Sequence, residues 1–190
     1  MIRLFAAIPL PEAMRERLSR LNGGVPGARW VAPENMHITL RFIGEVDEGR
    51  AQDIDAALDT VTAQPFPLTL SGLGNFGRGH RAHTLWVGVE KNPALHHLRD
   101  KVESAVVRAG LPAEERKYSP HITLARLKDT NSAKLGRFLE ENGMFQDGPI
   151  MVERFCLYES ILGRSGPVYH EVRSYPLGGW SPGGDEAGEE

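Results

Sequence analysis

The chain has 190 residues, the size of one large domain or of two closely joined lobes. Hydrophobic residues make up 41% and charged residues 25%, which excludes a disordered chain. No apolar run approaches the ~18 residues of a membrane helix, and the apolar part of the N-terminus is too short for a secretory signal. The single cysteine, Cys156, excludes an internal disulfide and a multi-cysteine zinc site. We expect a cytoplasmic protein without membrane contact, and we expect it to be a monomer.

The formal net charge of −3 is unevenly distributed. Four acidic residues lie among the last ten positions, so residues 1–180 carry a formal net charge of +1. This near-neutral body argues against non-specific binding of duplex nucleic acid through a large basic face. Because the C-terminal stretch is rich in glycine and acid and has no apolar anchor, we predict one domain over residues 1–178 and a disordered acidic tail over 179–190.

Strands and helices alternate along the chain. The Pro11–Glu12 step and the N-cap residues Asp47 and Asn92 mark helix starts, and glycines mark two of the helix ends. Apolar runs and alternation mark the strands. We predict strands at 2–9, 29–31, 36–43, 66–73, 84–89, 121–127, 150–157 and 168–175, and helices at 12–21, 48–61, 93–108 and 132–141. The pattern is that of an α+β domain with antiparallel strand pairs.

One short segment occurs twice. Met-His-Ile-Thr-Leu at 36–40 returns as Pro-His-Ile-Thr-Leu at 120–124, 84 residues later. This offset is close to half of the predicted ordered length, and it exceeds the period of solenoid repeats. The repeat therefore predicts two related lobes, each with one copy of the motif in a strand.

Side chains two positions apart in a strand share one face. His37 and Thr39 therefore point the same way, as do His121 and Thr123, while the intervening isoleucines and leucines face a core. If the two lobes pack about a pseudo-two-fold axis, both polar faces meet across one cleft. A single copy would be read as a structural pair, but two copies in equivalent contexts favour a functional site.

Two imidazoles and two hydroxyls suit phosphoryl chemistry. One neutral histidine can remove a proton from water while a protonated one donates to a leaving oxygen. Threonine hydroxyls can hydrogen-bond the non-bridging phosphoryl oxygens, where charge gathers in the transition state. Opening of a cyclic phosphodiester fits this set of groups, and it requires no metal ion or other cofactor.

Two arginines follow the motifs. Arg41 has the same strand parity as His37 and Thr39, so it either extends that face toward a phosphate or reaches to solvent. Arg126 has the opposite parity to His121, so it reaches the site only if the strand ends or twists before it.

The segment Gly72–Gly77 fits the pattern G-x-G-x-x-G of dinucleotide-binding proteins. That fingerprint also needs a helix opening at the motif, and here a strand-like sequence follows instead, which excludes a Rossmann site. The loop with Phe76, Arg78 and Arg81 either borders a nucleotide cleft, supplying stacking and phosphate contacts, or is a plain hairpin loop.

The remaining histidines and the cysteine are interpreted as structural or surface residues. A histidine pair spaced H-x-x-H lacks a third ligand nearby, so we expect no metal site there. The cysteine lies in an apolar strand and is expected to be a buried small hydrophobe. These residues are His80 and His83, His96 and His97, His170, and Cys156.

The first motif and its flanks, RWVAPENMHITLRFIGEV at 29–46, closely resemble the first motif of the 2H phosphoesterases. Within that superfamily the likeness is greatest to the bacterial and archaeal RNA 2′,3′-cyclic phosphodiesterases, also called 2′-5′ RNA ligases. The second motif of the family is similar to YSPHITLAR at 118–126. The resemblance extends from Arg3 to Tyr169 and includes all four motif positions.

The resemblance implies a bilobal α+β fold, in which two pseudo-symmetric antiparallel sheets with outer helices surround a central cleft. It also implies metal-independent hydrolysis of an RNA terminal 2′,3′-cyclic phosphate to a 2′-phosphomonoester, with RNA ends as partners. His37 would be the proton donor, His121 the proton acceptor, and Thr39 and Thr123 would hold the phosphoryl oxygens. Some members also join RNA ends through a 2′-5′ linkage.

Two other functions stay open on the sequence. The same mechanism could act on small cyclic nucleotides or on an ADP-ribose cyclic phosphate. Alternatively, the chain could be a nucleotide- or RNA-end-binding module without turnover. The two histidines argue against the latter, because phosphate binding alone more naturally uses arginine or lysine.

Overall fold

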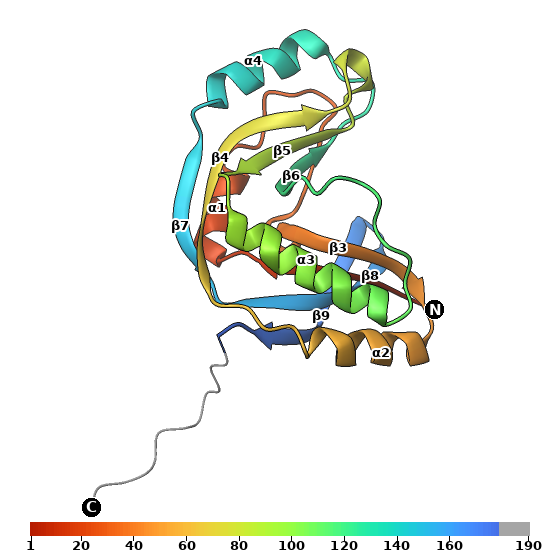
Figure 1. Ribbon diagram of the computed structural model, residues 1–190. Coiled ribbons are helices and arrows are strands. Elements are labelled where there is room, and N and C mark those ends of the chain that lie inside the picture. Colours follow the sequence, from red (N-terminus) through yellow and green to blue (C-terminus); the bar gives the residue numbers. More distant parts are fainter. Residues whose placement is uncertain (179–190) are drawn as a thin grey trace, which may run out of the picture.

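The computed structural model describes residues 1–178, which form two antiparallel sheets and four α-helices (Figure 1). The first sheet has the order β3-β1-β8-β9 and the second the order β2-β6-β5-β4-β7. The strands are β1 (Ile2–Pro9), β2 (Arg29–Trp30), β3 (His37–Val46), β4 (Phe66–Phe76), β5 (Thr84–Val89), β6 (His121–Arg126), β7 (Gln146–Val152), β8 (Arg154–Gly163) and β9 (Gly166–Pro176). The helices are α1 (Glu12–Ser19), α2 (Glu48–Leu58), α3 (Pro93–Arg108) and α4 (Ser132–Asn142). The predicted tail at 179–190 lies outside the described residues.

Local sequence signals account for most of these elements. The strands predicted at 2–9 and 84–89 have the predicted bounds. Asp47 and Asn92 are N-caps as predicted, and their side chains accept hydrogen bonds from the backbone N–H groups of Arg50 and Leu95. The two-lobed α+β architecture with antiparallel sheets is confirmed.

The strand predicted at 150–157 is wrong. The chain leaves β7, which pairs with β4 in the second sheet, and after Glu153 it enters β8, which pairs with β1 in the first sheet. Both strands are rich in apolar residues, so their sequences merge into one run. Hydrophobicity alone carries no signal for a change of sheet, which depends on distant partners.

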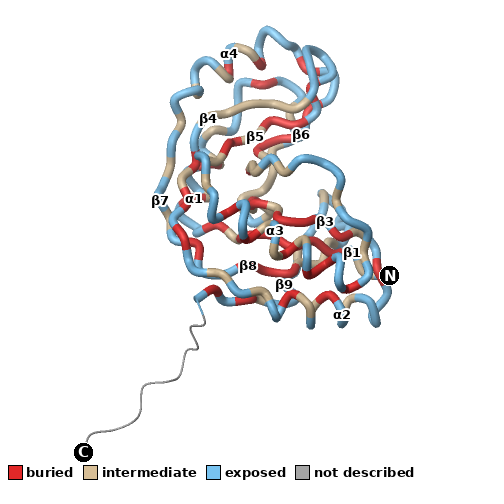
Figure 2. The backbone as a smooth tube through the Cα atoms, viewed as in Figure 1, coloured by how far each residue is buried: buried red, intermediate tan, exposed pale blue. Residues whose placement is uncertain are grey.

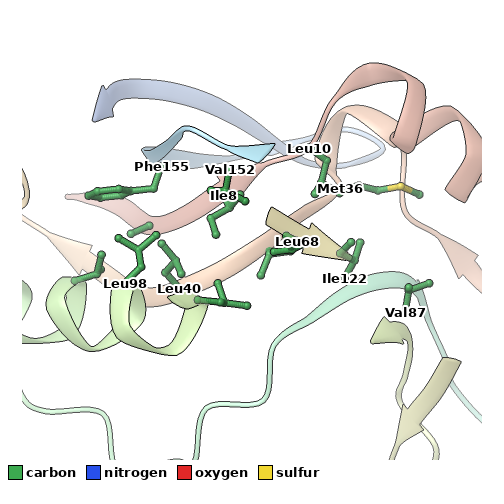
Figure 3. Packing of buried hydrophobic residues seen from close by; sticks show 14 of the residues in the cluster. Ile8, Leu10, Met36, Leu40, Leu68, Val87, Leu98, Ile122, Val152 and Phe155 are labelled. Atoms are coloured by element: carbon green, nitrogen blue, oxygen red, sulfur yellow. The ribbon is translucent and has the colours of Figure 1, made fainter. Parts of the chain in front are cut away.

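One hydrophobic core runs through both sheets. Figure 2 shows that the buried stretches follow β1, β3, β5, β6 and β8. In Figure 3, side chains of the first sheet and of α3 lie beside side chains of the second sheet, among them Ile8, Leu40, Leu98, Phe155, Leu68 and Ile122. The two lobes therefore do not have separate interiors. No helix within residues 1–178 combines the length and apolar character that a membrane crossing requires.

The repeated segments occupy equivalent places in the two sheets. β3 pairs with β1, and β6 pairs with β5, in both cases antiparallel. Each pair also has a bulge at the same point of the motif: the register skips Leu40 in β3 and Leu124 in β6. A bulge places one extra residue in a strand and reverses the facing of the residues that follow. This shared irregularity supports the interpretation of two related lobes.

Candidate active site

A cleft of about 710 Å³ lies between the two sheets and is lined by both copies of the motif. His37 and Thr39 reach it from β3, and His121 and Thr123 reach it from β6. The strands β3 and β6 contact each other, although they belong to different sheets. The structure thus brings the four motif side chains, 84 residues apart in the sequence, into one site.

Hydrogen bonds to residues around the start of β3 orient the ring of His37. Its Nδ1 lies 2.8 Å from the carbonyl oxygen of Asn35, and its Nε2 lies 3.0 Å from Oγ1 of Thr39. Because a carbonyl can only accept, Nδ1 carries the proton, and Nε2 of the neutral ring accepts from the Thr39 hydroxyl. The rings of Phe5 and Tyr169 pack around it, with centroids at 4.8 and 5.4 Å.

His121 repeats the same arrangement. Its Nδ1 lies 2.8 Å from the carbonyl oxygen of Ser119, again two residues earlier in the chain. Phe76 packs edge-on against the ring with a centroid distance of 4.9 Å. In both histidines the Nδ1 atom is therefore occupied, which leaves Nε2 as the atom available to exchange a proton with a ligand in the cleft.

Both imidazoles favour the neutral form in the unliganded protein. Burial lowers the pKa of His37 to about 4, against the bond to Asn35 that favours its charged form, and positive charge on His121 and Arg126 adds to the lowering. Burial also lowers the pKa of His121, opposed by the bond to Ser119, with Arg126 contributing. A bound phosphoryl anion would raise the pKa of both rings, because a nearby negative charge stabilises imidazolium.

Both alternatives predicted for Arg41 are wrong: its side chain is buried, so it neither extends the face of His37 toward a phosphate nor reaches solvent. Because of the bulge at Leu40, the side chain of Arg41 turns to the opposite face, where its Nε lies 2.5 Å from Oε2 of Glu103 on α3. It also donates to the backbone oxygens of Phe42 and Pro112. Phe42 takes the cleft-facing position instead.

The equivalent bulge at Leu124 has the opposite effect on Arg126. Strand parity alone points this side chain away from His121, but after the bulge it lines the cleft. Its Nη1 donates to Oγ1 of Thr84 at 3.1 Å. Phe42 and Arg126 are thus counterparts in the two lobes, each five positions after its motif histidine.

The loop after β4 brings fewer side chains to the cleft than the sequence analysis considered. Phe76 contacts the ring of His121, whereas Arg78 and Arg81 are exposed and are not among the residues that line the cleft. β4 continues through the glycines to Phe76, and β5 follows a short 3₁₀ turn, so no helix opens at this motif, as predicted. Within residues 1–178 no three His, Cys, Asp or Glu side chains are grouped as a metal site requires.

Other residues of the cleft were not found from the sequence. Arg3, Arg29 and Tyr169 line it, and Tyr118 ties the two motifs together, since its hydroxyl donates to the carbonyl oxygen of Thr39 at 2.8 Å. Arg29 and Tyr118 lie in the motif flanks, and Arg3 and Tyr169 mark the two ends of the resemblance, which assigns no role to any of the four. Cross-strand partners, which decide these positions, cannot be read from one chain segment.

Comparison with known proteins agrees with this geometry. The family model described as LigT like Phosphoesterase matches twice, over residues 8–86 and 87–169, so each match contains one motif histidine. The RNA 2′,3′-cyclic phosphodiesterase of Aeropyrum pernix is 40% identical over 172 residues, which cover 85% of this chain and 97% of that protein. The protein of the same name from Archaeoglobus fulgidus is 31% identical over 177 residues, covering 92% and 99%.

Solved structures show the same fold. E. coli LigT, in a crystal structure with 3′-AMP, superposes with a TM-score of 0.76 at 28% identity, over 93% of this chain and 98% of that one. The paired motifs, the shared bulges and these similarities lead to one conclusion. The chain belongs to the LigT-like phosphoesterase family.

Proposed function

We propose that this protein hydrolyses the 2′,3′-cyclic phosphate at an RNA end to a 2′-phosphomonoester. The observation that carries the proposal is the equivalent placement of two imidazoles in one cleft, each with Nδ1 bonded to a carbonyl. The relatives from Aeropyrum pernix and Archaeoglobus fulgidus, named for this activity, support the choice of substrate.

In this mechanism His121 is neutral and His37 is protonated when the substrate is bound. Nε2 of His121 accepts a proton from water, and the water oxygen attacks phosphorus. The bond from phosphorus to the 3′ oxygen breaks, and Nε2 of His37 gives its proton to that oxygen. The balance is one water consumed, with a 2′-phosphomonoester and a free 3′ hydroxyl formed. The division of roles between the two histidines follows the family resemblance.

The other polar groups of the cleft act on the phosphoryl oxygens. The hydroxyls of Thr39 and Thr123 donate to the non-bridging oxygens, and Arg126 supplies positive charge beside them. The substrate anion raises the pKa of His37 from about 4, so that the ring holds the proton that it must donate. If the 5′ hydroxyl of a second RNA takes the place of water, the same steps form a 2′-5′ linkage.

The test uses an oligoribonucleotide that ends in a 2′,3′-cyclic phosphate, with EDTA present. We expect conversion to the 2′-phosphomonoester by the unmodified protein and a loss of at least about 10²-fold in kcat for His37→Ala and His121→Ala. His97→Ala, on the exposed side of α3, is the matched control and should keep full activity. Absence of conversion, or full activity of both cleft variants, would refute the proposal.

The same assay separates the other candidates. Faster turnover of mononucleotide or ADP-ribose cyclic phosphates than of the oligonucleotide would assign the activity to small cyclic phosphates. Binding of the oligonucleotide without turnover would indicate an RNA-end-binding module.

A further inference from the structure

Two arginines face each other across neighbouring strands of the cleft. β2 pairs with β6 so that Arg29 is the direct partner of Arg126, and both line the cleft. Direct partners in an antiparallel pair lie on one face, with Cβ atoms about 5 Å apart, and like charges in this arrangement destabilise a sheet. The pairing therefore has an electrostatic cost in the unliganded protein.

Within residues 1–178 neither arginine is in an ion pair that would offset this cost, and Glu34, which also lines the cleft, pairs with neither of them. Arg17, Arg41 and Arg173 each form an ion pair with an acidic side chain, but neither Arg29 nor Arg126 does in this part of the chain. The one side-chain hydrogen bond of the pair runs from Arg126 to the neutral hydroxyl of Thr84. Two guanidinium groups thus remain available to anions in the cleft.

The two arginines differ in their distance from the histidines. The charge of Arg126 lowers the pKa of both His37 and His121, so this guanidinium lies close to the position of the reacting phosphoryl group. Arg29 lies one strand farther out, on β2, whereas Arg126 shares β6 with His121. The cleft of about 710 Å³ is lined by Arg29 as well as by both motif histidines, so it extends from the histidines to β2.

We propose that Arg29, next to Arg126, binds a second phosphate, the one on the 5′ oxygen of the terminal nucleotide. This inference rests on the proposed function and narrows its substrate class. A nucleotide within an RNA chain carries that phosphate as a diester, whereas a nucleoside 2′,3′-cyclic phosphate with a free 5′ hydroxyl lacks it. Two anions of the substrate then match two guanidinium groups, and the site selects ends of RNA chains.

The experiment compares three substrates that differ at the 5′ oxygen: adenosine 2′,3′-cyclic phosphate, its 5′-phosphorylated form, and an oligoribonucleotide with the same 3′ end. We expect Arg29→Gln to lower kcat/KM about tenfold on the last two, the loss of one charge-assisted contact, and to leave it within about twofold on the first. Arg29→Lys should keep part of the activity. Arg137→Gln, an exposed arginine on α4, is the control for charge.

The pattern of the three substrates decides the proposal. Equal losses on all three, no loss on any, or a loss confined to the 5′-phosphorylated mononucleotide would overturn it. On a longer oligonucleotide, Arg29→Gln should also reduce the slope of log KM against log salt concentration by about 0.7, the value for one phosphate contact to a single strand.

A binding measurement separates this inference from the proposed activity, because it needs no turnover. By calorimetry, adenosine 2′,5′-bisphosphate should bind the unmodified protein about tenfold more tightly than adenosine 2′-monophosphate, and Arg29→Gln should remove the difference. Equal binding of the two nucleotides, or a preference that survives in Arg29→Gln, would contradict the second site whatever the outcome of the hydrolysis assay.

Discussion

The two imidazoles of the cleft share a local bonding pattern but not an environment. His37 is enclosed by the rings of Phe5, Tyr158 and Tyr169, and positive charge on His121 lowers its pKa further. His121 is less deeply enclosed and contacts Phe76. In the proposed mechanism one ring donates a proton and the other accepts one, so the charge states of the two rings would govern the rate. The pH profile of the reaction is therefore the most direct test at the scale of single residues.

We expect the plot of kcat/KM against pH to be bell-shaped, with its maximum on the acid side of about 6.5, the unperturbed pKa of histidine. The reason is that kcat/KM reports the free protein, in which both pKa values are lowered, that of His37 to about 4. The profile of kcat should lie at higher pH, because the bound phosphate anion raises both values. Initial rates over a pH series at fixed ionic strength measure both, and a flat profile between about pH 5 and 9 would contradict an acid–base pair.

Tyr118 sets the relation between the two motifs through one hydroxyl. It donates to the carbonyl oxygen of Thr39, and the next residue, Ser119, supplies the carbonyl that holds His121. We expect Tyr118→Phe to lower kcat about five- to tenfold with little change in KM, since one hydrogen bond is worth about 1 kcal/mol. The pKa of His121, followed by NMR, should fall as its bond to Ser119 loosens.

Tyr175→Phe is the matched control, because it removes a hydroxyl bonded to Asp55, outside the cleft lining. This variant should change stability but neither kcat nor the pKa of His121. Identical kinetics of Tyr118→Phe and the unmodified protein would exclude the positioning role.

At this scale the sequence predicted the paired motifs because strand alternation is a local property. The prediction from strand alternation failed for Arg41, and for Arg126 it depended on whether the strand ended or twisted. One bulge in each strand reverses the face of the sheet to which all later side chains point. A bulge depends on the partner strand and leaves no mark in the tetrapeptide itself. The pairing of Arg29 with Arg126 could not be predicted for the same reason, because the two residues lie far apart in the sequence.

Among the elements, the segment between α3 and β6 has no regular secondary structure, but hydrogen bonds hold it to β3 and α3. Arg41 of β3 reaches it by donating to the carbonyl oxygen of Pro112, and Glu103 of α3 accepts from the backbone N–H of Glu114. The ion pair between buried Arg41 and partly buried Glu103 thus connects β3, α3 and this segment. It fixes the path by which the chain passes from one motif to the other.

We expect Arg41→Met to destabilise the protein by about 3 kcal/mol, because the Glu103 carboxylate, only 15% exposed, then loses its charged partner. The double variant Arg41→Met/Glu103→Leu should recover much of this loss, since no charge remains uncompensated. Urea unfolding of the two single variants and the double variant measures the coupling. Additive losses would show that the two side chains do not act as a pair.

Element prediction succeeded where a cap or a turn residue marks the boundary and failed where the boundary is set by pairing. The N-cap residues Asp47 and Asn92 marked the starts of α2 and α3 correctly. The junction at Glu153 had no such marker, so β7 and β8 were merged. The strand predicted at 66–73 was also too short. The glycines near its end suggested a loop, but β4 continues through them and pairs with β5.

The whole molecule has two sheets but one interior. Because buried side chains of both sheets belong to a single cluster, the loss of one sheet would expose the core of the other. The half-length repeat predicted this duplication, but it could not predict that the two halves share a core. We infer that residues 1–178 fold as a unit.

This inference predicts coincident unfolding of the two sheets. In a Trp180→Phe background, tryptophan fluorescence reports the second sheet through Trp30 and Trp86, and the thiol reactivity of Cys156 reports the first. We expect both signals to change at the same urea concentration, as a two-state transition requires. Midpoints that differ between the probes would mean that the lobes unfold independently.

The divergence between Phe42 and Arg126 has a consequence for how the cleft distinguishes its two sides. A pocket made from duplicated halves with identical linings would accept a ligand equally well in either of two orientations, turned end for end. A ring on one wall and a cation on the other remove that ambiguity. In the proposed reaction, this difference between Phe42 and Arg126 would hold a cyclic diester one way round, so that only one of its two ester oxygens lies beside His37.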